Sequence, residues 1–298
     1  MTASTRILQL LELSEEGPAL EDLAEFLSDG DPAVRRNALS VLSECTEDDE
    51  WAQAAPYFAA ALSDPSDEVR AAAMKLLREL VEVIEPGAEF VRHLRRAAAG
   101  PDPGVRASAI EALWRHRISG EDELRSLFDD PDETVRCSAV LGFVSIDSLD
   151  ALAVASADAA SAVRLAAARG FAAVGDPRGV TALLTLAGDT DEQVRAAALD
   201  AFGALGCTGD AVTVAAAALR EPSWQVRQSA ARALGSAEEA LAAECLVAAS
   251  ADDNLDVRKA AVQSLAGFKS ESPRIRDALR TATSDPDADV RAYARMGL

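Results

Sequence analysis

Lysine, histidine and aromatic side chains are scarce in this sequence. Three of the 29 basic residues are lysine, two residues are histidine, and aromatic residues make up 4% of the 298 residues. Acidic residues number 50, so the formal net charge is −21. Nonspecific binding to DNA, RNA or an anionic membrane requires a basic face. We therefore expect neither a nucleic-acid partner nor a membrane partner.

Sequence signatures of catalysis and of metal binding are also missing. The chain has no H-E-x-x-H, Walker or G-x-S-x-G motif, and two histidines hold a metal only with help from carboxylates or thiols. Four widely spaced cysteines form no C-x-x-C motif: Cys45, Cys137, Cys207 and Cys245. We predict free thiols in a reducing compartment, no metal, no cofactor and no enzymatic activity.

Long apolar runs and a secretory signal are absent from the sequence. No apolar run reaches the ~18 residues that a membrane span needs. Glu12, Glu15 and Glu16 follow a short N-terminal apolar run, unlike a signal peptide. Arginine in place of lysine is typical of a high-GC genome, and a high-salt cytoplasm is the alternative. We expect a cytoplasmic, bacterial protein.

A Val-Arg pair recurs nine times, at intervals of 28 to 36 residues. A period of this length indicates a repeat architecture. With the valine counted as position 0, alanine occupies position +4 and leucine or phenylalanine occupies position +8 in every copy. Apolar residues at this spacing form one stripe of an amphipathic helix, and the small residue at +4 predicts a close helix crossing. The valines are Val34, Val69, Val105, Val135, Val163, Val194, Val226, Val257 and Val290.

The start of this recurring helix is also encoded. Position −3 is a good N-cap residue in eight copies, with Ala160 as the exception. Position −5 is acidic in eight copies, with Gly100 as the exception. An acid at −5 and an arginine at +1 predict a ladder of ion pairs between neighbouring repeats, in which Arg195 is a partner of Asp189. The alternative is that nine aligned arginines bind a polyanion.

The order of these features resembles the second helix of HEAT repeats: an acid at −5, an N-cap residue at −3, Val-Arg at 0 and +1, alanine at +4 and leucine at +8. The mean spacing of 32 residues is similar to the short HEAT-like repeats of the phycobilisome lyase type. The resemblance implies an all-α, armadillo-like solenoid over residues 1–298. It also implies a right-handed superhelix of about nine two-helix repeats and a partial N-terminal cap at residues 1–16. Glycines Gly175, Gly206 and Gly235 are expected to end second helices as C′ residues.

Positions +2, +6 and +9 lie on the side of the second helix opposite its apolar stripe. In a two-layer solenoid this side lines the concave groove, where we predict that an acidic or amphipathic peptide binds. Its middle is apolar and its flanks are basic. The alternative is that repeats 3 to 5 curl tightly and bury these side chains. The predicted binding residues are Lys75, Arg78, Trp114, Leu141, Val144, Leu165, Arg169, Arg232 and Lys259.

The third repeat has an excess of bases in an acidic protein, and it contains both histidines. One interpretation is an anion-binding patch. The other is a solvated helix face that offsets the acidic N-terminal repeats. The residues concerned are Arg92, His93, Arg95, Arg96, Arg115, His116 and Arg117.

The last repeat is expected to have no capping helix after it. We predict that Leu279, Val290 and Leu298 then leave an apolar edge that allows self-association. For the whole chain we predict a non-catalytic scaffold or adaptor with a protein or peptide partner. Its alternatives are a component of a bilin lyase-like enzyme and a HEAT-like DNA-repair protein.

Overall fold

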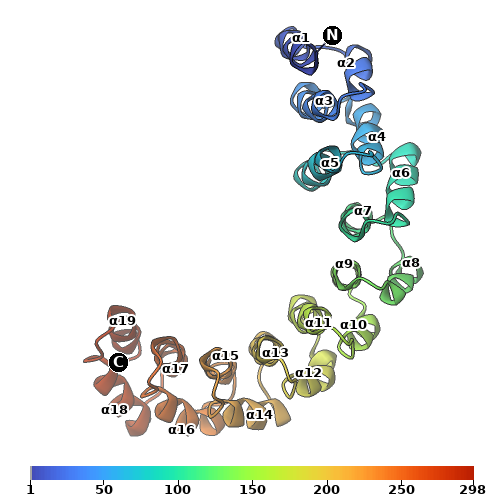
Figure 1. Cartoon of the computed structure of the whole chain (residues 1–298). Coiled ribbons are helices and arrows are strands. Elements are labelled where there is room, and N and C mark those ends of the chain that lie inside the picture. The colour runs from blue at the N-terminus through green and yellow to red at the C-terminus, as the bar shows by residue number, and fades with distance from the viewer. Residues whose placement is uncertain (1) are drawn as a thin grey trace. The chain divides into compact units, whose positions relative to one another are not determined.

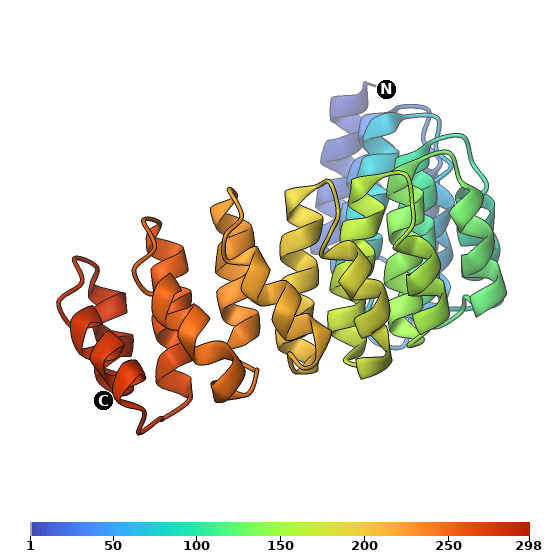
Figure 2. The same ribbon diagram turned by 90° about the horizontal axis from the view of Figure 1, so that it is seen from below.

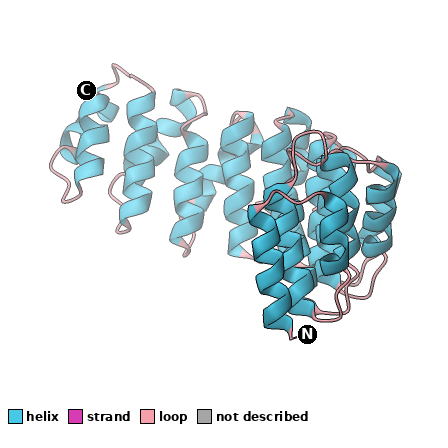
Figure 3. Ribbon diagram, turned by 90° about the horizontal axis from the view of Figure 1, so that it is seen from above, coloured by secondary structure: helices cyan, strands magenta, loops and turns pink. Residues whose placement is uncertain are grey.

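The computed structural model describes residues 2–298 and consists of helices joined by loops (Figure 3). Between Thr2 and Leu298 it contains nineteen α-helices, two short 3-10 helices and no strand. These elements form two compact units, which divide between Ser145 and Ile146. The all-α prediction is therefore confirmed for the described residues.

Unit 1 ends at Ser145 and contains α1 to α9. Its helices are α1 Ala3–Glu15, α2 Leu20–Leu27, α3 Pro32–Cys45, α4 Trp51–Ala61, α5 Asp67–Glu79, α6 Ala88–Ala98, α7 Pro103–Arg115, α8 Glu121–Arg125, η1 Ser126–Asp129 and α9 Glu133–Ser145.

Unit 2 begins at Ile146 and contains α10 to α19. Its helices are α10 Leu149–Ala155, α11 Ser161–Val174, η2 Pro177–Gly179, α12 Val180–Leu186, α13 Glu192–Leu205, α14 Asp210–Ala218, α15 Trp224–Leu234, α16 Glu239–Ala249, α17 Leu255–Gly267, α18 Pro273–Ala282 and α19 Ala288–Met296.

Within each unit the helices alternate between two rows (Figure 1). The second helices α3, α5, α7 and α9 pack one against the next in unit 1, and α11, α13, α15, α17 and α19 do so in unit 2. The first helices, among them α12, α14, α16 and α18, form the other row. Figure 2 shows the pairs of unit 2 side by side. Sequential packing of helix pairs is the arrangement that the repeat predicted.

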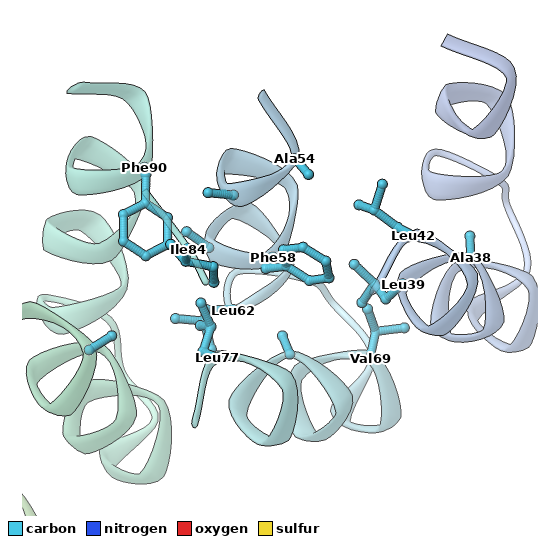
Figure 4. Close-up of a cluster of buried hydrophobic side chains, with 14 of the residues drawn as sticks. Ala38, Leu39, Leu42, Ala54, Phe58, Leu62, Val69, Leu77, Ile84 and Phe90 are labelled. Carbon is cyan, nitrogen blue, oxygen red and sulfur yellow. The ribbon is translucent and has the colours of Figure 1, made fainter. Parts of the chain in front are cut away.

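The core lies between the two rows, and the apolar stripe of the second helices builds one wall of it. The valines at position 0 and the alanines at +4 are buried in all nine copies, and so are the +8 residues except Leu298. The first helices supply the other wall. In unit 1, Phe58 of α4 points toward Leu39 and Leu42 of α3, and Leu62 lies beside Leu77 of α5 (Figure 4). The predicted stripe is therefore confirmed.

Side-chain caps begin most of the second helices. Asp31, for example, accepts a hydrogen bond from the backbone N–H of Ala33 at 2.9 Å. Asp102, Asp132, Asp191, Asn254 and Asp287 make bonds of the same kind. Ser66 and Ser223 make no such bond. The Ser223 hydroxyl donates instead to Oε1 of Gln225 at 2.9 Å, so its expected role as a cap is wrong.

Two expectations about helix ends need correction. The second repeat suggests a second helix over Ser66–Val83, but α5 ends at Glu79, and Ile84 after it is buried. Gly175 ends α11 in the left-handed region with φ 73°, as expected. Gly235 also follows the last residue of its helix, α15, but its φ is −65° and not left-handed. A Cβ at Gly235 would lie 2.5 Å from Oγ of Ser264 on α17, so this glycine permits close helix packing.

A helix lies in the predicted N-terminal cap segment, whereas the last helices differ from expectation. The predicted cap segment 1–16 contains α1, which packs against α3 as a member of the second-helix row. At the other end, Leu279 and Val290 are buried, so the prediction that they form an exposed apolar edge is wrong. They pack within the last helix pair and against α17. The exposed apolar side chains there are Met296 and Leu298.

No helix between Thr2 and Leu298 is long and apolar enough to cross a membrane.

Ion pairs between the +1 arginine and the −5 acid of the following repeat connect successive second helices. The nitrogen–oxygen distances are 2.6 to 2.8 Å. The pairs are Arg35–Asp64, Arg106–Asp130, Arg164–Asp189, Arg195–Glu221, Arg227–Asp252 and Arg258–Asp285. The predicted ladder is confirmed. Its register differs at Arg195, because the carboxylate of Asp189 belongs to Arg164 of the preceding repeat.

Each ladder guanidinium also holds its own loop. Nη1 of Arg195 donates to the carbonyl oxygens of Asp189 at 2.8 Å and Thr190 at 3.1 Å, while Nε and Nη2 hold Glu221. The acids are fixed in turn, since Oδ1 of Asp189 accepts the backbone N–H of Asp191 at 2.8 Å. Nε, Nη1 and Nη2 of Arg195 thus all donate hydrogen bonds within the protein. This favours the structural ladder over a polyanion site.

Two positions show how the ladder adapts. Arg70 meets Gly100 at the −5 position of the next repeat, and it pairs with Asp67 and Asp102 instead. Arg6 of α1 donates to Asp29 at 2.9 Å and lies over the ring of Phe26. The sequence contained a signal that α1 extends the ladder. Relative to Thr5 as position 0, Thr2 stands at −3 and Arg6 at +1, as in the second helices.

The ladder changes the acidity of its carboxyl groups. Hydrogen bonds from the guanidinium of the preceding repeat are the main reason that the pKa values of Asp189, Asp252 and Asp285 lie below the ordinary range. A lowered pKa in the folded state means that folding favours the carboxylate. The resulting stabilisation is complete above the unfolded pKa of about 3.9 and is lost as the pH falls through the folded values.

We predict that Arg195→Ala destabilises unit 2 without selectively abolishing binding. The change leaves the carboxylate of Glu221 and two loop carbonyls without their donor. Lost hydrogen bonds to charged groups of this kind cost about 1–3 kcal/mol of unfolding free energy. Denaturant unfolding measures the loss. The control is Arg220→Ala, an exposed arginine without an ion pair among residues 2–298, and equal stability of the two variants would contradict the prediction.

We predict that Asp189→Asn weakens the acid dependence of stability. The wild type should lose the unfolding free energy that the ionised Asp189 contributes as the pH falls below about 4 and through the lowered pKa of Asp189. The variant should be less stable at pH 7, where the wild-type carboxylate is ionised, and should approach the wild type at low pH. Denaturant midpoints measured between pH 7 and 3 test this, and parallel curves would count against it.

Candidate binding surface

The second-helix face is the side of the second-helix row formed by positions +2, +6 and +9. In unit 1, Lys75, Arg78 and Leu141 are exposed on this face, whereas Trp114 and Val144 are half-buried. Leu141 retains 49% of its exposure, but the indole Nε1 of Trp114 is buried without a hydrogen-bond partner among the described residues. In this unit Leu141 is therefore the most accessible apolar residue of the predicted set.

In unit 2, Arg169 and Arg232 are exposed on the same face, and Leu165 and Lys259 are half-buried. The predicted set is thus divided between the units. Lys75, Arg78, Trp114, Leu141 and Val144 belong to unit 1, and Leu165, Arg169, Arg232 and Lys259 belong to unit 2.

Most bases of the second-helix face already have an acidic neighbour. In unit 1, Arg36 pairs with Glu68 at 3.4 Å, Lys75 with Glu79 at 3.7 Å and Arg78 with Glu111 at 3.5 Å. In unit 2, Arg232 pairs with Asp200 at 2.7 Å and Lys259 with Asp289 at 2.8 Å. Sequence reasoning missed these pairs, because all but Lys75–Glu79 join residues about 30 positions apart.

Arg169 of α11 differs from the other bases of this face. It is exposed, and no carboxylate within residues 2–298 pairs with it. The nearest acid by repeat position is Asp200, at +6 of the next second helix. Both oxygens of Asp200 accept bonds from Arg232, at 2.7 and 2.8 Å from Nη2. Among the bases of the second-helix face in unit 2, Arg169 is therefore the one that is open to an external anion.

A hollow of about 440 Å³ lies beside Arg169, between α11, α13 and α15. Its residues come from three successive repeats of unit 2, which are held together by the ladder pairs Arg164–Asp189 and Arg195–Glu221. Alanines of α11 and α13 leave room for it. The polar residues that line it are Arg169, Glu192, Gln193, Asp200, Gln225, Ser229 and Arg232.

The residues of the predicted anion patch have separate partners. Arg92 pairs with Glu89 at 2.6 Å, Arg95 with Glu123 at 3.1 Å and Arg115 with Glu111 at 3.5 Å. Arg115 also donates to the carbonyl of Arg78 at 3.3 Å. Arg96 and Arg117 are exposed. These contacts fit the alternative interpretation, a helix face with locally balanced charge.

The two histidines of this region lie in different surroundings. His93 lies 3.8 Å from the carboxylate of Glu89. His116 is half-buried at the end of α7 and meets the ring of Phe90 edge-on. Burial first, and the charge of Arg115 second, lower the pKa of His116 below its ordinary value. His116 therefore favours the neutral form, which is poorly suited to hold an anion.

Metal-binding geometry is not found in the part of the chain that the structure describes. No three side chains of histidine, cysteine, aspartate or glutamate converge there as ligands. Burial raises the pKa of the Cys207 thiol to about 11. That thiol is consequently held in its protonated, unreactive form.

Solved structures share this fold at low sequence identity. An engineered protein determined in a structural-genomics programme has a TM-score of 0.58 and 20% identity, over 92% of this chain and 86% of its own. Kap121p has a TM-score of 0.56 and a mutant of it 0.57, each at 13% identity. The matches cover 94% and 93% of this chain but 37% of either Kap121p chain.

The sequence itself matches one family. Among curated proteins none matches. The family model described as HEAT repeats matches residues 6–78, 148–235 and 212–298, which together are more than half of the chain. With the paired helices and the ladder described above, this match confirms the resemblance to HEAT repeats. The chain belongs to the HEAT-repeat family.

Proposed function

We propose that the chain is a non-catalytic scaffold or adaptor that binds a protein or peptide on its second-helix face. HEAT-repeat solenoids are typically protein-interaction scaffolds. Their stacked repeats form extended surfaces suited to this work. In each unit the second-helix row offers such a surface, because its apolar stripe is buried and its opposite side is open to solvent.

One observation carries this proposal: the repeat is uniform at its structural positions and varied at position +6. Positions +1, +4 and +8 hold arginine, alanine, and leucine or phenylalanine throughout. Position +6 is exposed in eight copies and half-buried at Glu111. Its residues are Ser40, Lys75, Glu111, Leu141, Arg169, Asp200, Arg232, Gln263 and Met296. A surface that is mostly exposed and varies in chemistry from repeat to repeat is suited to recognise a specific sequence.

The partner that fits this face is acidic or amphipathic. Leu141 offers an apolar contact in unit 1, and Arg169 offers an open positive charge in unit 2. The remaining bases are bound in ion pairs, so a uniformly acidic chain would have to displace their carboxylates. An amphipathic peptide with few charges meets the face without that cost. We therefore favour the amphipathic partner of the two.

Within the HEAT-repeat family, the resemblance to the short repeats of the phycobilisome lyase type stays a prediction. A role in attaching a bilin also stays a prediction. A HEAT-like DNA-repair protein is the other alternative. The charge of −21 weighs against that alternative, because backbone phosphates require a basic face.

We predict that a photo-crosslinking residue at Ser40 of α3 or at Gln263 of α17 captures the partner in the native host. Both residues are exposed on the second-helix face, one in each unit. The matched controls are Gln53 of α4 and Leu241 of α16, which are exposed on first helices. Gel analysis followed by mass spectrometry should identify the same protein from Ser40 or Gln263 and not from the controls. Capture confined to the first-helix positions would refute the proposal.

A further inference from the structure

The hollow between α11, α13 and α15 contains two opposite charges without ion-pair partners. Arg169 lies on α11, and Glu192 lies at the first position of α13. Neither residue forms a salt bridge with any residue between Thr2 and Leu298. Arg169 differs from the other bases of the second-helix face, which are paired, and Glu192 lies in the same hollow, where its charge also interacts with that of Arg195 on its own helix. The hollow thus has a positive and a negative side.

The pair Asp200–Arg232 fixes this arrangement. Arg232 binds the Asp200 carboxylate through Nε at 3.1 Å and Nη2 at 2.7 Å. Nη2 also donates to the buried hydroxyl of Ser229 at 3.2 Å. Three bonds and a buried anchor hold Arg232 toward Asp200, so Asp200 stays with α15 and does not neutralise Arg169. Asp200 and Arg232 contribute no net charge to the hollow.

Neutral amides line the hollow where other repeats have charges. Lys259 at +2 pairs with Asp289 at −1 of the next repeat in unit 2, and Arg36 pairs with Glu68 in the same way in unit 1. At the hollow the corresponding residues are Ala196 at +2 and Gln225 at −1. Oε1 of Gln225 accepts the Ser223 hydroxyl, which leaves its amide N–H groups free to donate. Gln193 supplies a second exposed amide.

We infer that this hollow binds a short peptide segment that carries one acidic and one basic side chain. Arg169 receives the carboxylate, and Glu192 receives the ammonium or guanidinium group. The amides of Gln193 and Gln225 match a peptide main chain, because each offers both a donor and an acceptor. The inference rests on the proposed function and names the ligand class at one part of the second-helix face.

Both charges are exposed, so each contributes modestly to affinity. Exposed ion pairs contribute little, and loss of one charge should weaken binding by about two- to fivefold. Selectivity then comes from the combination, since a peptide with only one of the two charges leaves the other side of the hollow unpaired.

The test is an NMR titration of ¹⁵N-labelled full chain with three capped peptides. The first is acetyl-Glu-Gly-Gly-Lys-amide, and the others replace either its glutamate or its lysine by glutamine. The first peptide should bind about two- to fivefold more tightly than each of the others. Shifts should include the Nε–H resonance of Arg169 and the backbone amide resonances of the first turn of α13.

Two variants test which residue of the hollow binds which charge of the peptide. In Arg169→Gln the advantage of glutamate over glutamine in the peptide should vanish while the lysine advantage remains, and in Glu192→Gln the reverse should hold. Arg220→Gln removes an exposed arginine of unit 2 that lies outside the hollow, and it should preserve both advantages. Equal binding of the three peptides to wild type, or an unchanged glutamate advantage in Arg169→Gln, overturns the inference. If these titrations fail while Ser40 or Gln263 still captures a partner, the hollow is excluded and the proposed function stands.

Discussion

Within each unit, the ion pairs between +1 arginines and the acids that precede the next second helices fix the spacing of the repeats. One guanidinium joins three parts of the chain: its own helix, the loop before that helix and the following repeat. In Arg195 these are the carbonyls of Asp189 and Thr190 and the carboxylate of Glu221. A planar fork with five N–H donors holds a carboxylate and a loop at once, whereas the single ammonium of lysine has no such fixed geometry. The need for this fork explains why arginine fills position +1 in all nine copies of a chain with three lysines.

This ladder and the core leave the second-helix face free to vary. The core uses one stripe of each second helix, and the ladder uses the start of that helix. Neither involves the exposed side of position +6. Stability in such a stack comes from each repeat and its contacts with its neighbours. A substitution at Gln263 or Ser40 should therefore change recognition without unfolding the stack, which is the separation of roles that a binding scaffold requires.

How much the sequence predicts depends on how often a feature is repeated. The buried valines and the +4 alanines recur nine times and the −5 acid eight times, so a single odd copy such as Gly100 did not hide the pattern. Features that occur once were harder to predict. Gly235 has the sequence position of a helix-ending glycine, but Ser264 on the neighbouring helix determines its role. Leu279 and Val290 are buried within the last pair and against α17, although the sequence predicted that they form an exposed edge.

The charges of the binding surface depend on neighbours that lie one repeat away. Arg169 and Arg232 occupy the same repeat position and look equivalent in the sequence. Asp200 lies between them by repeat position, and it binds Arg232, which Ser229 also holds. Because Asp200 pairs with Arg232, Arg169 has no carboxylate partner within residues 2–298. The charge of −21 repels an acidic partner at long range, but the Debye length of about 8 Å at physiological salt confines this repulsion. The proposed recognition at the second-helix face therefore depends on local ion pairs, and these favour a partner with charges of both signs over a uniformly acidic one.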